Sequence, residues 1–457
     1  MLYLTTARKV CFAAGAGVSD TILISLMLEG GPDFRHVFVP PFESNPSSYG
    51  YTFWKGRALS HALDPEDDQA LQERWNEYFH LESGTTPFGI HPACEWLKDQ
   101  FDQGNVAVIN NVFGSRNRDH AHSVTILESG NMSAKANETE QSGWGGRLSH
   151  VCGTNVLAST RAVRQFCYGP HPTNPMDHDN KNVIDCSDSR QMGLYEYETD
   201  LSNNQWRWHS EGIMSRALTG YYAAKATEIK ENSPYYQIIQ HEQSVRGFGR
   251  LMKERLEDVP LPEAISNLYD PGSQSRLNSL YYGGQIRNIY DTLACEDILN
   301  SNVISTAYPG WDHHQNLKSN MEPMIEDIFG AGRGLDTLFA ELDSNQSTMA
   351  DRIVIMVCGE FGRQLAANGG GGTDHGVGNA VLLIGRNVNG GIYGDMFPQS
   401  EIERFAQPGT DIEGRTSVNQ VIGRICEQVK PGSADSVVPS WQTQDLEQGV
   451  DLSLLFS

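Results

Sequence analysis

The residue types best suited to metal or acid–base chemistry in this sequence occur in short polar clusters beside apolar runs. The clusters read EGGPD, RNRDHAHS, GWDHH, GEFGR and GTDHG. Four of them directly follow an apolar run of strand length, and GTDHG lies in the loop before a fifth such run. Carboxylates and imidazoles together are the ligands of mixed oxygen and nitrogen sites for zinc, manganese and similar divalent metals. The clusters therefore predict a metal site if their loops converge.

The candidate side chains also have ordinary structural interpretations. They are Asp33, Asp119, His120, His122, Asp312, His313, His314, Glu360, Arg363, Asp374 and His375. A turn residue, a helix cap, a loop histidine with satisfied hydrogen bonds, or a salt bridge between Arg363 and Glu360 would each explain part of the set. No cluster decides by itself, and their joint placement beside strands favours a site.

The apolar runs predict the elements that must position these side chains. Runs with the length and character of buried strands lie at residues 21–28, 105–114, 302–308, 352–357 and 380–385, with a further short strand at 35–42. Apolar residues recur at helical spacing at 91–103 and 321–342. Strands that alternate with helices indicate an α/β fold with a mostly parallel central sheet flanked by helices. In such a sheet, loops at the carboxyl ends of the strands converge on one crevice.

Residues 152–301 interrupt this pattern with a turn-rich, irregular part followed by charged, helix-forming segments. We expect a single α/β domain over residues 21–457, in which 152–301 is an inserted helical and irregular region that caps or walls the pocket. Residues 1–20 are set apart as an N-terminal segment that resembles a degenerate export signal, although its apolar part is short and polar. The compartment, periplasmic or secreted against cytoplasmic, stays open.

Composition excludes several classes of partner. The formal net charge of −23 argues against binding to nucleic acid or to anionic membrane surfaces. No apolar stretch approaches the roughly 20 residues that a transmembrane helix needs. The eight cysteines show no CxxC spacing, so a cysteine zinc site is not expected. An anionic substrate would need a local positive centre, such as a metal ion or a buried arginine.

The order of the motifs GGPDFRHVFVPPF, NRDHAHSVTILESGN, SGWGGR, GWDHHQN, GEFGR and GGTDHGVG resembles domain-of-unknown-function family 1501. That family is grouped with the alkaline phosphatase superfamily, alongside sulfatases and cofactor-independent phosphoglycerate mutases. The resemblance runs from about residue 21 to 398, and 152–301 matches mainly by position.

This resemblance implies an alkaline-phosphatase-like fold and a site for one or two divalent metal ions, zinc, manganese or similar. It implies that Asp312, His314 and His375 bind one metal. Asp33 and Glu360 are then the acids of a second metal, and Asp374 is a further candidate ligand. Superfamily members usually carry Asp-His where this chain has Glu360-Phe361, so the second metal lacks its usual histidine.

The resemblance also implies a nucleophile at the start of the helix after the second strand, where the superfamily carries Ser, Thr or a modified Cys. This chain has Asp119 there, between Arg118 and His120. Asp119 could bind metal or act as the nucleophile. His120 or His122 would serve as general acid, and Arg363 would stabilise developing charge. The departure leaves three options: attack by water that the metal activates, a shifted nucleophile, or no hydrolysis.

The sequence thus predicts a metal-dependent hydrolase of phosphate or sulfate esters that acts on a small-molecule or saccharide ester. The alternative is a catalytically inactive metal-binding or scaffold protein of the same fold, and a phosphomutase would need a hydroxyl where Asp119 stands. The substrate, the identity of the metal and the oligomeric state are not determined by the sequence.

Overall fold

A computed structural model describes most of the chain. The described residues are 21–84, 86–136, 138, 141–159, 164–170, 178–179, 182–186, 188–190, 196–200, 205–209, 213–226, 228–230, 233–269, 277–345, 348–439, 441–442 and 450–456. The predicted N-terminal segment, residues 1–20, lies outside them. Among the described residues, no helix combines the length and the apolar character needed to cross a membrane.

The central feature is a nine-stranded sheet in the order β17–β5–β16–β13–β1–β12–β6–β9, with β18 beside β5. Its strands are β1 (Ile22–Glu29), β5 (Val106–Phe113), β6 (Asn155–Ala158), β9 (Val183–Asp185), β12 (Ser301–Pro309), β13 (Ile353–Cys358), β16 (Asn379–Ile384), β17 (Gly391–Tyr393) and β18 (Thr416–Ser417). Only β16 runs antiparallel to its neighbours, β13 and β5. The predicted mostly parallel α/β fold is therefore confirmed.

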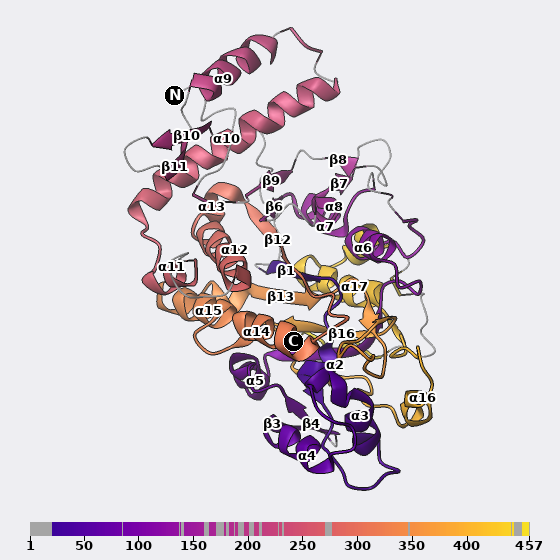
Figure 1. Ribbon diagram of the computed structural model, residues 1–457. Helices are drawn as coiled ribbons and strands as arrows, with labels where there is room; N and C mark the ends of the chain where they lie inside the picture. Colours follow the sequence, from indigo (N-terminus) through magenta and orange to yellow (C-terminus); the bar gives the residue numbers. More distant parts are fainter. Residues whose placement is uncertain are drawn as a thin grey trace.

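Helices cover both faces of this sheet (Figure 1). Alternate residues of β1 point to opposite sides, so Ile24 and Leu26 join one apolar core while Leu23 and Met27 join another. The first core is completed by α5 (Glu95–Asp102), α12 (Leu277–Ala294), α14 (Leu317–Phe329) and α15 (Gly334–Asn345). The second is completed by α7 (Trp144–Cys152) and α17 (Val418–Val429).

A smaller three-stranded sheet of β2 (Phe38–Val39), β4 (Thr86–Ile90) and β3 (Phe79–Ser83) lies with α3 (Tyr49–Arg57) and α4 (Asp68–Asn76). The strand predicted at 35–42 is only partly present. The Asp33 carboxylate accepts a hydrogen bond from the Arg35 amide and starts α2 (Phe34–Val37), so extended structure begins only at Phe38. A local side-chain cap therefore overrides the apolar pattern.

The region predicted as an insertion has two parts. Within 152–301, β6, β9 and α12 belong to the central sheet or its cover, whereas α9 (Ile213–Ala226) and α10 (Pro234–Asp258) extend away from the sheet (Figure 1). The other described elements there are α8 (Arg164–Cys167), β7 (Gly169–Pro170), β8 (His178–Asp179), β10 (Glu196–Asp200), β11 (Gln205–His209), α11 (Glu263–Tyr269) and α13 (Glu296–Leu299). The domain boundaries stay a prediction.

The remaining short elements are η1 (Ala58–His61), α6 (His120–Ser129), η2 (Ala350–Arg352), β14 (Gly362–Arg363), β15 (His375–Gly376), η3 (Gln399–Glu401), α16 (Ile402–Phe405) and α18 (Ala434–Val437). Two of them, β14 and β15, form an antiparallel hairpin between β13 and β16, in which Arg363 pairs with His375. This hairpin is the segment that carries GEFGR and GTDHG.

Candidate metal centre

Loops from three parallel strands and the β14–β15 hairpin meet at one edge of the sheet. His120 is the first residue of α6, which follows β5, while Asp312 and His314 follow β12 and Glu360 follows β13. Gly30, after β1, makes the close approach possible. A Cβ on Gly30 would lie 2.4 Å from the Asp312 nitrogen, and its φ of +113° is one that other residues rarely adopt.

At this edge the Asp312 carboxylate faces three histidines, and we call these four side chains the candidate centre: His120, Asp312, His314 and His375. Nε2 of His375 lies 3.0 Å from Oδ1 of Asp312 and 3.0 Å from Nε2 of His314. His314 Nε2 is 3.1 Å from Asp312 Oδ1, and His120 Nε2 is 3.5 Å from Asp312 Oδ2. His120, Asp312 and His375 each offer one ligand atom within 4.8 Å of the other two.

The outer nitrogen of each imidazole ring in the candidate centre faces an oxygen that can only accept. Nδ1 of His120 donates to Glu360 Oε1 at 2.9 Å, Nδ1 of His314 to Asp374 Oδ1 at 2.9 Å, and Nδ1 of His375 to the Arg118 carbonyl at 3.0 Å. With its hydrogen on Nδ1, a neutral ring presents a lone pair at Nε2.

The Nε2 atoms of His314 and His375 face each other and also lie 3.1 and 3.0 Å from Oδ1 of Asp312, an oxygen that accepts, so a proton or a cation must lie at these contacts. Two lone pairs 3.0 Å apart, on His314 and His375, repel unless a cation or a proton lies between them. Inward Nε2 lone pairs on rings oriented by outer acceptors are the arrangement of histidine metal ligands.

Glu360 and Asp374, predicted as metal ligands, lie behind the histidines. Glu360 is only 3% exposed, and its carboxylate accepts hydrogen bonds from the Gly30 amide at 2.8 and 2.9 Å and from the Gly31 amide at 3.2 Å. Asp374 Oδ1 accepts from His314 and, at 2.9 Å, from the Asn368 amide group. Both carboxylates therefore orient a histidine.

Arg363 is 1% exposed, and all three of its guanidinium nitrogens donate within the protein. Nε donates to the Gly31 carbonyl at 2.7 Å, and Nη1 to the Thr373 carbonyl at 3.0 Å. Nη2 donates to Asp312 Oδ1 at 3.0 Å and to two further carbonyls. Burial would raise the pKa of Asp312, but Arg363 lowers it. The guanidinium thus holds the loops together, and its role in stabilising developing charge stays a prediction.

Asp33 stands apart from the candidate centre. It is 2% exposed, and its Oδ2 accepts from Arg57 and from the Thr373 hydroxyl at 2.8 Å. Burial would raise the pKa of Asp33, but the Arg57 guanidinium and other neighbours hold it below its usual range. A cation from the protein itself therefore already neutralises the acid that was predicted to bind a second metal.

Asp119 caps α6, because its Oδ1 accepts from the His122 amide at 2.9 Å. His122 donates from Nε2 to the Ala134 carbonyl at 2.8 Å. His313 is buried, and burial lowers its pKa to about 4.

The sequence did not identify Arg118, whose backbone carbonyl accepts the Nδ1 hydrogen of His375. Every residue has a backbone carbonyl, so the residue type gives no sign of this role.

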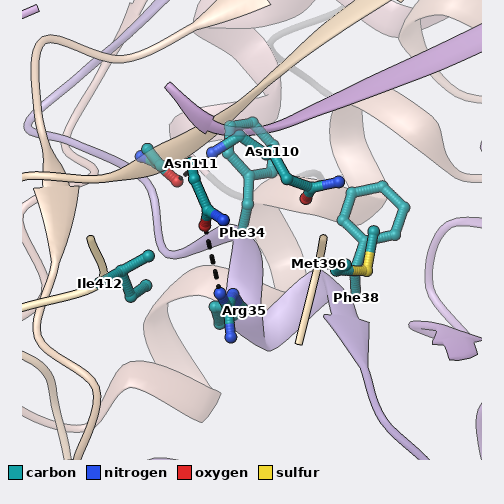
Figure 2. Close-up of a pocket in the computed structure, with 9 residues that line it drawn as sticks. Phe34, Arg35, Phe38, Asn110, Asn111, Met396 and Ile412 are labelled. Atoms are coloured by element: carbon teal, nitrogen blue, oxygen red, sulfur yellow. Dashed lines mark hydrogen bonds between the residues drawn. The ribbon is translucent and has the colours of Figure 1, made fainter. Parts of the chain in front are cut away.

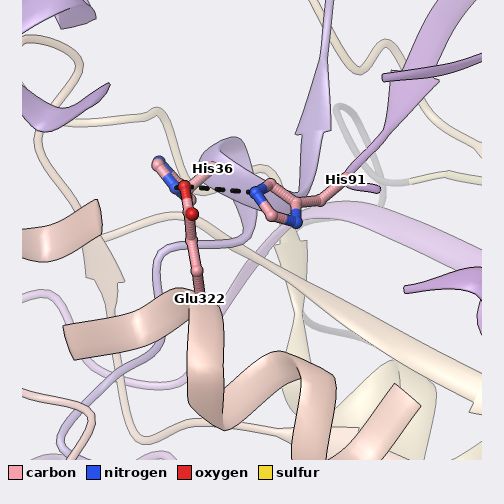
Figure 3. Close-up of side chains that lie close together, drawn as sticks. All are labelled: His36, His91 and Glu322. Atoms are coloured by element: carbon pink, nitrogen blue, oxygen red, sulfur yellow. Dashed lines mark hydrogen bonds and ion pairs between the residues drawn. The ribbon is translucent and has the colours of Figure 1, made fainter. Parts of the chain in front are cut away.

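A second group of histidine and carboxylate side chains, which the sequence did not reveal, lies among His36, His91 and Glu322, and we call it the buried cluster (Figure 3). Glu322 Oε1 is 3.1 Å from His36 Nε2, 3.2 Å from His91 Nε2 and hydrogen-bonded to the Arg74 guanidinium. His91, Arg74 and Glu322 also line a groove of about 590 Å³.

A small internal cavity lies beside Arg35, Asn110 and Asn111 (Figure 2). Its volume of about 10 Å³ is of the size that holds one water molecule. Arg35 is paired there with Glu401 at 3.1 Å and donates to the Tyr49 hydroxyl at 2.7 Å. The cavity is therefore too small for a substrate.

Part of this chain matches a known protein family, and the chain is distantly similar to solved structures. No curated protein sequence matches it. A solved structure from work on glycosaminoglycan metabolism by Bacteroides thetaiotaomicron is 9% identical, covers 92% of this chain and 74% of that chain, and has a TM-score of 0.32. The crystal structure of Ps i-CgsB with k-i-k-neocarrahexaose is 11% identical, covers 86% and 75%, and has a TM-score of 0.27. Residues 299–427, which carry every candidate residue after β12, match the family described as protein of unknown function DUF1501.

Proposed function

We propose that this protein is a metal-dependent hydrolase of phosphate or sulfate esters, with one divalent metal held by His120, His314, His375 and Asp312. The observation that carries the proposal is the orientation of the three imidazole rings. Each Nδ1 lies within hydrogen-bond distance of an outer oxygen acceptor, which leaves each Nε2 directed at the Asp312 carboxylate as the nitrogen available to a metal. This assigns His120 as a ligand and not as the proton donor.

The donor set fits a borderline metal such as zinc, and manganese or iron would also accept three imidazoles and one carboxylate. When bound, such a metal would neutralise anionic oxygens and acidify a water molecule. Glu360 and Asp374 would keep the rings of His120 and His314 in the ligating orientation. Arg363 would keep the Asp312 loop against the β1 loop.

The geometry favours a single metal. A second ion would need Asp33 and Glu360, but Asp33 is neutralised by Arg57, and Glu360 is engaged by the Gly30 amide and His120. The resemblance to the alkaline phosphatase superfamily supports an anionic ester as substrate. With a net charge of −23 and with Arg363 engaged, this chain would depend on the metal to attract that anion.

The positions of the candidate nucleophiles favour attack by water. Asp119 is used as a helix cap, and Ser115 is buried with its hydroxyl donating to Asn117 Oδ1 at 2.7 Å. The same observations favour a second candidate, a metal-binding protein without catalytic activity, because Asp119 and Arg363 are both committed to structure.

The first experiment is elemental analysis of protein purified without added metal, followed by assays with chromogenic phosphate and sulfate esters. We expect about one equivalent of metal, and hydrolysis that disappears with the metal in His314→Ala. Bound metal without hydrolysis of any ester would select the non-catalytic candidate. A chain that neither carries metal nor is stabilised by adding zinc, manganese or iron would contradict both.

A further inference from the structure

Arg118 has an unfavourable backbone conformation next to the candidate centre. Its φ is +59°, in the left-handed region that residues with a Cβ seldom occupy. It lies two residues before His120, so its conformation also sets the path by which the chain enters α6. A strained residue in such a place persists only when its surroundings hold it.

The Arg118 side chain is held by one acidic residue. Its Nε donates to Oδ2 of Asp411 at 3.1 Å, its Nη2 donates to the same oxygen, and Nη2 also reaches the Gly409 carbonyl at 3.3 Å. Asp411 is itself anchored next to the hairpin. Its backbone forms an isolated antiparallel β-bridge with Gln364, and the Ile412 amide donates to the Arg363 carbonyl at 3.2 Å. The salt bridge therefore ties Arg118 to the hairpin that carries His375.

The left-handed conformation directs the Arg118 carbonyl to His375. That carbonyl accepts the Nδ1 hydrogen of His375 at 3.0 Å, and the ring then directs Nε2 at Asp312 Oδ1 and His314 Nε2, each 3.0 Å away. If the carbonyl turned away, Nδ1 would lose its acceptor. The hydrogen could then move to Nε2, where it would block binding of a metal.

We propose that Arg118 and Asp411 are positioning residues of the metal centre: their salt bridge keeps Arg118 left-handed, so that its carbonyl holds the Nδ1 hydrogen of His375 and leaves Nε2 directed at the candidate centre. This inference rests on the proposed metal site. It adds two residues that touch neither metal nor substrate and act through His375.

The test compares Arg118→Ala with Arg118→Gly in metal affinity, measured by competition with a chelator. Both variants lose the salt bridge, but glycine adopts positive φ at little cost whereas alanine does not. We expect Arg118→Ala to bind metal about 10- to 100-fold more weakly, the usual loss for an outer partner of a ligand. Arg118→Gly should stay within a few-fold of the wild type.

Electrostatics alone predicts the opposite sign, since removing a positive charge near a bound cation would strengthen binding in both variants. Equal affinities in the two variants, or tighter binding by both, would overturn the proposal. In the Arg118→Gly background, Asp411→Asn should change nothing further, and an additional loss would also count against it.

Two further measurements separate positioning from general damage to the fold. The melting temperatures of the metal-free variants should agree within a few degrees. Ring-nitrogen NMR of metal-free protein should show the hydrogen on Nδ1 of His375 in the wild type and its partial loss in Arg118→Ala, whatever the protonation of Nε2 beside Asp312. Hydrogen retained fully on Nδ1 in Arg118→Ala would refute the mechanism. A wild type that binds no metal would instead refute the proposed function, and this inference with it.

Discussion

The candidate centre and the buried cluster contain the same residue types with opposite placement of hydrogen. In the buried cluster, Nδ1 of His91 accepts a hydrogen bond from the Ala93 amide at 3.1 Å, so a neutral His91 carries its hydrogen on Nε2 and donates it to Glu322. In the candidate centre, each Nδ1 faces an outer oxygen acceptor and each Nε2 faces in. Two histidines and a carboxylate therefore do not define a metal site until the outer partner of each ring is known.

The two regions also differ in what neutralises the carboxylate. Arg74 donates to Glu322 and lies 2.9 Å from Nε2 of His91, so a guanidinium occupies the place that a metal would need. Burial lowers the pKa of His36 to about 4, although its hydrogen bond to Glu322 opposes the shift, so His36 is neutral at pH 7. We infer that the buried cluster binds α14 to the small sheet, with Arg74 as the cation that neutralises Glu322.

The largest expected effect distinguishes the two regions directly. His314→Ala removes one of four ligands and should reduce metal affinity by more than the roughly 100-fold that marks the upper range for outer partners. His91→Ala is the matched control, and it should keep the full metal content while lowering the melting temperature. Metal analysis of both variants makes the comparison. Loss of metal from His91→Ala would mean that the assignment of the two regions is wrong.

The buried cluster should make the larger contribution to stability. Glu322→Ala leaves two imidazole donors without their acceptor and Arg74 with Glu77 alone, and we expect a loss of about 3 kcal/mol, the lower end of the range for breaking a buried ion pair. Urea unfolding of the metal-free protein measures it. Glu326→Ala is the control on the same helix, because its pair with Arg333 at 3.2 Å is exposed and should contribute less than about 1 kcal/mol. Similar losses of stability in both variants would argue against the idea that the buried cluster holds α14 to the small sheet.

Acid should lower the free energy of unfolding through protonation of His36. Its pKa of about 4 in the folded state lies below the value of 6.5 expected when unfolded, so the unfolded chain binds more protons between these limits. The contribution of His36 to the free energy of unfolding is then fully present above pH 6.5. It decreases toward pH 4, by up to about 3 kcal/mol for a shift of this size. Unfolding of metal-free protein at several pH values tests this. His36→Asn should show a shallower pH slope, and an unchanged slope would exclude His36 as the cause.

The smallest of these effects concerns the outer carboxylate of His314. Asp374→Ala should weaken metal binding about 10- to 100-fold, which corresponds to about 1.4 to 2.7 kcal/mol. Asp374→Asn should lose less, because its amide oxygen still accepts from Nδ1. Chelator competition gives both affinities. If the alanine variant binds as tightly as the wild type, orientation of His314 by Asp374 is not needed.

The apolar runs predicted the five principal strands and the mostly parallel sheet, because burial on both faces requires continuous apolar segments. They also placed Asp312, His314 and His375 in loops expected to converge. The pattern was less informative at residues 35–42, where the Asp33 cap starts a helical turn. It also could not show that Asp33 pairs with Arg57, which lies 24 positions along the chain.

The sequence by itself thus determined the fold class and the edge of the sheet at which the polar residues gather. Only the tertiary structure decided what each of them does. Glu360 orients His120 from 240 positions away, and Arg363 holds the Gly31 carbonyl from 332 positions away. The physical reason is that a histidine becomes a ligand or a donor according to the partner of its other nitrogen, and that partner is brought to it by folding.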